Sequence, residues 1–219
     1  NVDRAETEEA LATRVNGDAV GLLGRLAAKA DIPVIHISTD FVFDGMLDRP
    51  YEETDPPNPI NAYGRSKLEG EKQLADSGCR YCLIRVEWTY GTAGVNFVKK
   101  IFEAAQVRPV LRVVDDQVGS PTATREAAQA ICQIVQKDIF PEGIYHLAAD
   151  GYTSRFEMAR FLCQLKGVNV TIEACKTAEF SSPAKRPLNS RFNCQKLESL
   201  LGRKMRPWQE PLQEFLEQL

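Results

Sequence analysis

The chain has 219 residues, enough for one domain, or for one domain with a small satellite, around a sizeable hydrophobic core. Its formal net charge is −3, so no basic face for nucleic acid is indicated. No apolar run approaches the roughly 20 residues that a membrane span needs, and no N-terminal signal peptide is recognisable.

The six cysteines do not indicate a disulfide framework in a chain of this length. Cys79 and Cys82 have CxxC spacing, which raises the question of metal or redox chemistry. Their segment reads as a strand, however, and an odd spacing on a strand sends the two thiols to opposite faces. We therefore expect a structural role for both, reduced thiols and a cytoplasmic protein.

Apolar residues recur every three or four positions near the N-terminus and predict a helix over residues 6–29. Its apolar stripe consists of Leu11, Val15, Ala19, Leu22, Leu26 and Ala30. The β-branched run Ile32–Ser38 then predicts a strand that is buried on both faces of a parallel sheet. The proline-rich stretch Asp40–Asn61 predicts a long loop.

Helices and strands alternate over the next part of the chain. Hydrophobic periodicity and capping residues predict helices over 62–76 and 96–105, from Thr124, from Ser154 and from Pro211, and strands over 80–86, 110–114 and 143–147. The alternation indicates an α/β fold with a partial Rossmann-like, doubly wound parallel sheet in residues 1–139. Residues 140–219 lose the alternation and predict a small, mostly helical substrate lobe.

The helix over 62–76 carries Tyr63 and Lys67, one helical turn apart on the same face. A phenol has an ordinary pKa near 10, and a cation held beside it stabilises the phenolate and lowers that pKa. Ser38 and Thr39 end the preceding strand at the edge where open α/β sheets bind ligands. Hydroxyls there can donate to a substrate oxygen that gains charge. A half-buried surface tyrosine and a capped strand end are the alternatives.

Seven segments carry a resemblance over nearly the whole chain. They read HISTDFVFDG (36–45), PYEETDPPNP (50–59), YGRSKLEGE (63–71), RVEWTYG (85–91), DQVGSPT (116–122), GIYHL (143–147) and RPLNSR (186–191). In this order they resemble the motifs of the dTDP-4-dehydrorhamnose reductases, a branch of the extended short-chain dehydrogenase/reductase family. The resemblance implies that Tyr63 protonates the C4 oxygen of a keto sugar. Lys67 would tune Tyr63 and bind the nicotinamide ribose, and Thr39 would polarise the carbonyl.

The same resemblance implies four substrate-binding residues. Asp40 and Trp88 would contact the sugar nucleotide, although a large aromatic at a strand end is often part of the core. Arg186 and Arg191 would meet a diphosphate, because guanidinium donors match phosphate geometry; a salt bridge on a solvated loop is the alternative for both.

Two positions depart from the family pattern. Phe41 stands where tyrosine is usual, and Glu87 stands where a small hydroxyl residue is common. Glu87 adds a negative charge beside the expected pyranose pocket, so the two departures leave the hydride-transfer residues intact but put the exact sugar in doubt.

The resemblance implies reduction of the C4 keto group of dTDP-4-dehydro-L-rhamnose, or of a close nucleotide sugar, by NADPH or NADH in dTDP-rhamnose biosynthesis. Two other interpretations stay open. One is a non-catalytic regulatory subunit resembling the methionine adenosyltransferase beta subunit, and the other is a nucleotide-sugar epimerase or dehydratase. Retention of Tyr63, Lys67 and Trp88 favours the reductase. The sequence leaves the oligomeric state open, a homodimer included. His36 and His146 stand far apart, without carboxylates at ligand spacing, and give no metal site.

No glycine-rich turn follows a strand anywhere in the sequence, and Gly17, Gly21 and Gly24 lie inside the first helix. By comparison with the family, about two strand–helix units, roughly 60 residues, would precede Asn1. We therefore expect the 219-residue chain alone to bind NAD(P)H poorly and to be inactive. We also expect the strand at 32–38 to present an unpaired edge.

Overall fold

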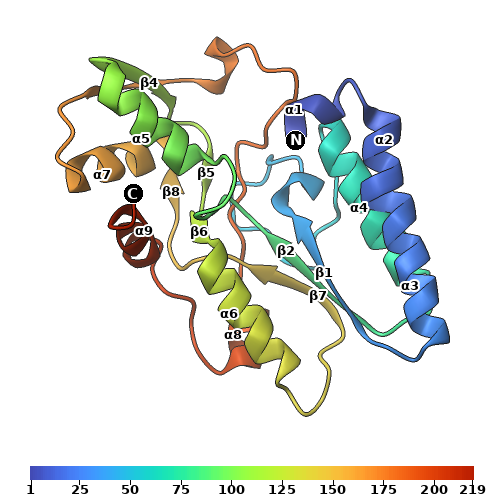
Figure 1. The fold of residues 1–219 in the computed structure, drawn as a ribbon. Helices are drawn as coiled ribbons and strands as arrows, with labels where there is room; N and C mark the ends of the chain where they lie inside the picture. Colours follow the sequence, from blue (N-terminus) through green and yellow to red (C-terminus); the bar gives the residue numbers. More distant parts are fainter.

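A three-stranded parallel sheet forms the centre of the fold in the computed structural model, which describes residues 1–219 (Figure 1). Its strands follow the order β1-β2-β7, with bounds β1 (Val34–Thr39), β2 (Tyr81–Val86) and β7 (Gly143–Leu147). The strand β1 pairs only with β2, so its outer edge has no neighbouring strand, which confirms the expected open edge.

Helices cover both faces of this sheet, because the strands carry apolar side chains on each side. Leu83 packs with Val20 and Leu74 on one face, whereas Cys82 and Ile84 pack on the other. The covering helices are α3 (Ala19–Lys29) and α4 (Ala62–Ala75) on the first face, and α6 (Thr124–Val135) and α8 (Gln195–Leu201) on the second. The doubly wound arrangement is confirmed.

A second lobe packs around its own apolar core, in which Val98, Leu162 and Leu212 are fully buried. It contains a further parallel pair of strands as well as three helices (Figure 1). Its main elements are α5 (Phe97–Val107), β4 (Val110–Val114), α7 (Arg155–Leu165), β9 (Thr171–Cys175) and α9 (Gln209–Leu216). The lobe is mostly helical, as expected, with one parallel pair of strands in addition.

The two lobes are interleaved along the chain. Helix α5 and strand β4 belong to the second lobe, while β7 pairs with β2 in the first sheet. The expected division into residues 1–139 and 140–219 does not separate the lobes, since the pairing of β4 with β9 joins residues about 60 positions apart.

Shorter elements connect these parts of the fold. They are α1 (Val2–Ala5), α2 (Glu9–Thr13), a π-helical segment (Arg14–Asp18), 3₁₀ turns at Asp40–Val42 and Thr177–Glu179, and the strands β3 (Thr89–Tyr90), β5 (Val118–Gly119), β6 (Thr122–Ala123) and β8 (Thr153–Ser154). No helix is both long enough and apolar enough to span a membrane. All six cysteines are free, and Cys79 and Cys82 pack on opposite faces of the sheet, as expected.

The first helical segment packs on α4 through its glycines and not through its apolar stripe. Gly17, Gly21 and Gly24 are buried, while the predicted stripe is exposed, with Leu22 52% accessible. A Cβ atom at Gly21 would lie 2.3 Å from the Oε1 atom of Gln73 on α4. The periodicity predicted the helix correctly, but the close approach of two helices needs the small residues on the contact face.

A buried ion pair joins α4 to the sheet. The Nε atom of Arg85 in β2 donates to Glu71 Oε1 at 3.0 Å, and Nη2 donates to Oε2 at 2.6 Å. Arg85 is 1% exposed and Glu71 is 5% exposed, so water screens neither charge. Breaking such a pair leaves one buried charge uncompensated.

The variant Glu71→Gln should lower the free energy of unfolding by about 3–5 kcal/mol, because Arg85 then loses its buried counter-ion. Urea denaturation followed by circular dichroism measures this change. The matched control is Glu103→Gln on the exposed surface of α5, which should change stability by less than about 0.5 kcal/mol. Equal stabilities of the two variants would refute a stabilising role for the ion pair.

His146 is a fully buried histidine on β7. Its Nδ1 atom lies 3.1 Å from the carbonyl oxygen of Tyr51, and its ring stacks on Phe192 with centroids 4.0 Å apart. Burial, reinforced by the positive charge of Arg85, lowers the pKa of His146 to about 3. The folded protein therefore holds this ring neutral.

Stability should fall as the pH drops below 6.5, because the unfolded chain then binds a proton at position 146 and the folded chain does not. For one histidine the slope approaches about 1.4 kcal/mol per pH unit until the folded pKa near 3 is reached. Urea unfolding at pH 7 and pH 5 should show a shallower pH dependence for His146→Gln than for the unmodified protein. An unchanged slope would contradict the buried neutral histidine.

Candidate active site

The N-terminus of α4 lies against the carboxyl end of β1 and brings Tyr63 beside Thr39. A Cβ atom at Gly64 would lie 2.1 Å from the carbonyl oxygen of Phe41, so only glycine permits this approach. The side chain of Asn61 caps the helix by accepting from the Gly64 amide at 2.7 Å. The ring of Phe41 meets that of Tyr63 edge-on, with centroids 5.6 Å apart.

The pKa of Tyr63 is raised from its ordinary value, chiefly by burial and then by the negative charge of Asp40, while the hydroxyl of Thr39 opposes the shift. The expected lowering by Lys67 is therefore wrong for this structure. The ammonium of Lys67 donates instead to the carbonyl oxygen of Ile37 at 2.7 Å, and burial lowers the pKa of Lys67. Tyr63 thus keeps its proton at neutral pH, as a proton donor must.

Asp40 is a buried carboxyl group held by two hydroxyl groups. Thr39 Oγ1 donates to its Oδ1 atom at 3.0 Å, and Ser190 Oγ donates to its Oδ2 atom at 2.5 Å. Burial raises the pKa of Asp40, although both hydrogen bonds favour the charged form. Sequence reasoning missed Ser190, even though it lies inside the RPLNSR segment.

Trp88 lies at the end of β2 with a left-handed backbone, at φ 45°. This conformation is uncommon for a large residue and occurs mainly where function or packing demands it. A Cβ atom at Gly119 would lie 2.7 Å from the Trp88 ring, so a glycine is needed opposite the indole. Trp88 lines the cleft described next, as its expected role requires.

Glu87 is enclosed by protein and does not line the cleft. Its Oε2 atom accepts from the Ser120 amide at 2.9 Å, and its Oε1 atom accepts from the Phe192 amide at 3.3 Å. Burial, and next the charge of Asp40, raise the pKa of Glu87 well above its usual range. Glu87 therefore contributes less negative charge to the pocket than the sequence suggested.

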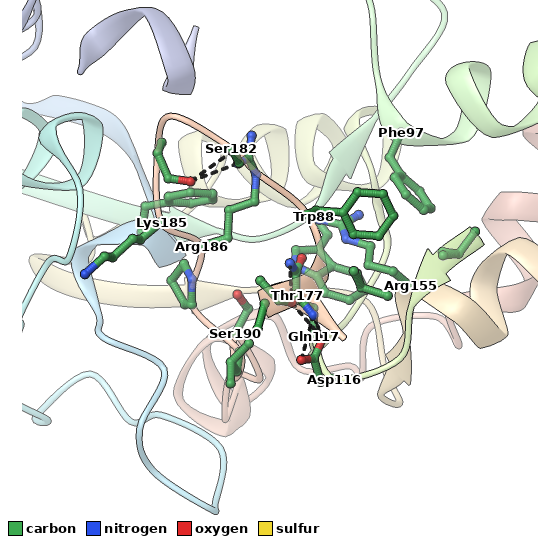
Figure 2. Close-up of a pocket in the computed structure, with 18 of the residues that line it drawn as sticks. Trp88, Phe97, Asp116, Gln117, Arg155, Thr177, Ser182, Lys185, Arg186 and Ser190 are labelled. Carbon is green, nitrogen blue, oxygen red and sulfur yellow. Dashed lines mark hydrogen bonds between the residues drawn. The ribbon is translucent and has the colours of Figure 1, made fainter. Parts of the chain in front are cut away.

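A cleft of about 900 Å³ opens between the two lobes (Figure 2). Phe41 and Ser190 line it, and they contact Tyr63 and Asp40, respectively. Thr39, Asp40, Tyr63 and Lys67 do not line the cleft themselves. The walls come from Trp88, from α5 and from the N-terminus of α7. Ligand pockets for small molecules have volumes of roughly 300–1,000 Å³, so the cleft has room for a ligand the size of a nucleotide sugar.

The two arginines expected to bind a diphosphate differ in their position relative to the cleft. Arg186 lines the cleft and pairs with Asp3, its Nη2 atom lying 2.9 Å from Oδ2. Arg191 lies outside the cleft, where its Nε atom donates to Asn189 Oδ1 at 2.9 Å and its Nη2 atom to the carbonyl oxygen of Asp48 at 2.5 Å. Two of its donor atoms hold a loop in this structure, and its contact with a diphosphate stays a prediction.

The strand end also fits the nicotinamide half of a dinucleotide. The Lys67 ammonium has donors left after its bond to Ile37, and the buried Ser38 hydroxyl has no hydrogen-bond partner. Tyr63 and Lys67 would hold the ribose there. No glycine-rich turn follows β1, β2 or β7, so these strands offer no cradle for the pyrophosphate.

The variant Gly64→Ala should lower the free energy of unfolding by about 1–3 kcal/mol, because its methyl group meets the backbone oxygen of Phe41. The matched control is Gly17→Ala, whose methyl group meets side-chain atoms of Glu69, at 3.0 Å, and of Thr13, at 3.6 Å. That control should cost clearly less than Gly64→Ala, because a side chain can shift away from the added methyl group and a backbone oxygen cannot. Chemical denaturation compares the two, and similar values would contradict the close approach of α4 to β1.

The chain is similar to a known protein family, to curated relatives and to solved structures. The RmlD substrate binding domain family matches residues 1–219. A curated dTDP-4-dehydrorhamnose reductase from Sinorhizobium fredii is 38% identical over 218 residues, which cover 95% of this chain and 74% of the relative.

Two crystal structures of similar proteins cover all of this chain and 77% of their own chains. A dTDP-4-dehydrorhamnose reductase ortholog from Clostridium acetobutylicum superposes with a TM-score of 0.94 at 34% identity. A dTDP-4-dehydrorhamnose reductase from Bacillus anthracis, in complex with NADP, gives a TM-score of 0.93 at 32% identity. The chain thus spans about three quarters of the length of these relatives.

Proposed function

Because this chain belongs to the RmlD substrate binding domain family, we propose that it acts in an NADPH- or NADH-dependent reductase of nucleotide sugars. The substrate is dTDP-4-dehydro-L-rhamnose or a close relative, whose C4 keto group becomes a hydroxyl group in dTDP-rhamnose biosynthesis. The relatives from Sinorhizobium fredii and Bacillus anthracis carry the name of this activity.

The observation that carries the proposal is the position of Tyr63 next to Thr39 and in edge-on contact with Phe41, which lines the cleft. The bound nicotinamide cofactor supplies the hydride that is added to C4. Tyr63 transfers its proton to the C4 oxygen, so that one hydride and one proton convert the ketone into an alcohol. Thr39 turns its hydroxyl hydrogen from Asp40 to the same oxygen as negative charge develops on it.

Lys67 acts by positioning. Its bond to the carbonyl oxygen of Ile37 fixes the ammonium against β1, one helical turn from Tyr63. From there it reaches the ribose of the cofactor and sets the distance between cofactor and phenol. The raised pKa of Tyr63 keeps the proton in place until an alkoxide forms, which is a much stronger base than water.

The cleft provides the substrate contacts. Trp88 would pack on the sugar, and Arg186 would reach the diphosphate beyond it. Asp40 is buried and bound to Ser190, which lines the cleft, and would accept a hydrogen bond from the sugar. The nucleoside end would lie in the second lobe, between α5 and the segment around Thr177. Free thiols throughout the chain fit a reducing compartment, the cytoplasm, as the place of this reaction.

Two other functions were compatible with the sequence. A regulatory subunit has no need of a tyrosine held against a threonine at a strand end, so the geometry favours catalysis. An epimerase or dehydratase retains its NAD and shows no net consumption of a reduced cofactor, whereas a reductase oxidises one NADPH or NADH for each sugar.

The variant Tyr63→Phe of the natural protein should lose on the order of 100-fold or more in kcat, because the proton donor is removed. The measurement is the loss of NADPH absorbance with dTDP-4-dehydrorhamnose as substrate. Tyr81→Phe, at the far end of β2, is the matched control and should keep its activity. Full kcat in Tyr63→Phe, or no NADPH consumption by the unmodified protein, would refute the proposed reaction.

A further inference from the structure

Arg155, the first residue of α7, lies with its guanidinium group against two aromatic rings of the cleft (Figure 2). The guanidinium carbon is 3.5 Å from the ring centroid of Trp88 and 4.7 Å from that of Phe97. A separation of 3.5 Å requires the planar group to face the indole. The N–H donors then point outward in the plane, free of the rings.

None of these donors has a partner within the protein. Of the nearby carboxyl groups, Asp40 is bound by Thr39 and Ser190, and Glu87 is bound by two backbone amides. Neither carboxyl group lies within ion-pair distance of Arg155, although the negative charge of each acts to raise the pKa of Arg155. The Arg155 side chain is partly exposed in the cleft and has no counter-ion, so a ligand that supplies one would be bound favourably.

A second cation shares the cleft. Burial lowers the pKa of Arg155 to about 10, so the group remains charged at neutral pH, and the positive charge of Arg186 adds to this lowering. Arg155 and Arg186 therefore repel each other across the space that both line. An anion between them would relieve the repulsion.

We propose that Arg155 is a substrate-binding residue that holds the sugar-proximal phosphate of the nucleotide diphosphate through paired N–H donors. This proposal rests on the proposed function, since a nucleotide sugar carries its negative charge on the diphosphate alone. The stacking on Trp88, near Asp40, places Arg155 toward the reacting end of the cleft, which is why the contact is assigned to the β-phosphate.

Titration calorimetry with dTDP and dTMP tests the assignment without any need for hydride transfer. Arg155→Gln should weaken dTDP binding by about 10- to 100-fold, because a charge-assisted pair of hydrogen bonds is lost. Binding of dTMP, which lacks the β-phosphate, should change by less than about threefold. Arg155→Lys keeps the charge but loses the planar arrangement of donors. Its affinity for dTDP should lie between that of the unmodified protein and that of Arg155→Gln.

The matched control is Arg160→Gln on the same helix, where the side chain is exposed and pairs only with Glu157. It should bind dTDP as the unmodified protein does. Unchanged dTDP binding in Arg155→Gln overturns the proposal, and so does an equal loss for dTMP. Suppose that dTDP binding depends on Arg155 but that the natural protein oxidises no NADPH with the keto sugar. This result would support the phosphate contact and refute the proposed reaction. Normal turnover with an unchanged KM in Arg155→Gln would instead overturn the phosphate contact and leave the proposed reaction standing.

Discussion

The site depends on how closely α4 approaches β1. Gly64 allows the first turn of the helix to touch the backbone of Phe41, and the Arg85–Glu71 ion pair holds the next turns against β2. Two contacts along one helix fix its distance from the sheet and its rotation. Tyr63 consequently reaches the end of β1 without depending on any flexible segment. A side chain placed by helix packing is positioned more accurately than one on a loop.

Burial controls the protonation of the site more than the neighbouring cation does. Tyr63, Asp40 and Glu87 all have raised pKa values, with loss of hydration as the leading cause in each case. The sequence predicted that the positive charge of Lys67 would lower the pKa of Tyr63, but its ammonium donates to the backbone carbonyl oxygen of Ile37. Loss of hydration thus opposes the charged form of each of these groups, so Tyr63 holds its proton until an acceptor oxygen is present.

The sequence predicted those features that have a period or a place in a motif. The strands β1, β2 and β7 and the helix α4 follow from regular apolar spacing, and the meeting of Tyr63 with Thr39 follows from parallel topology. The contact face of the first helix was predicted wrongly. The helix packs on α4 through its buried glycines, and the predicted leucine stripe is exposed. Arg155 was not identified from the sequence, because the direction of a single side chain at a helix start leaves no periodic signal. The lobe boundary failed because pairing of β4 with β9 is a long-range contact.

The interleaving of the lobes explains why the cleft residues cluster as they do. The chain leaves the central sheet after β2 at Trp88 and after β7 just before Arg155, and in both places it enters the second lobe. Each crossing is short, so both lobes constrain the residues within it. The left-handed backbone of Trp88 lies at the first crossing, and its indole meets the guanidinium of the second. The sugar end of the cleft is therefore built at the junction of the two lobes, where neither lobe alone could form it.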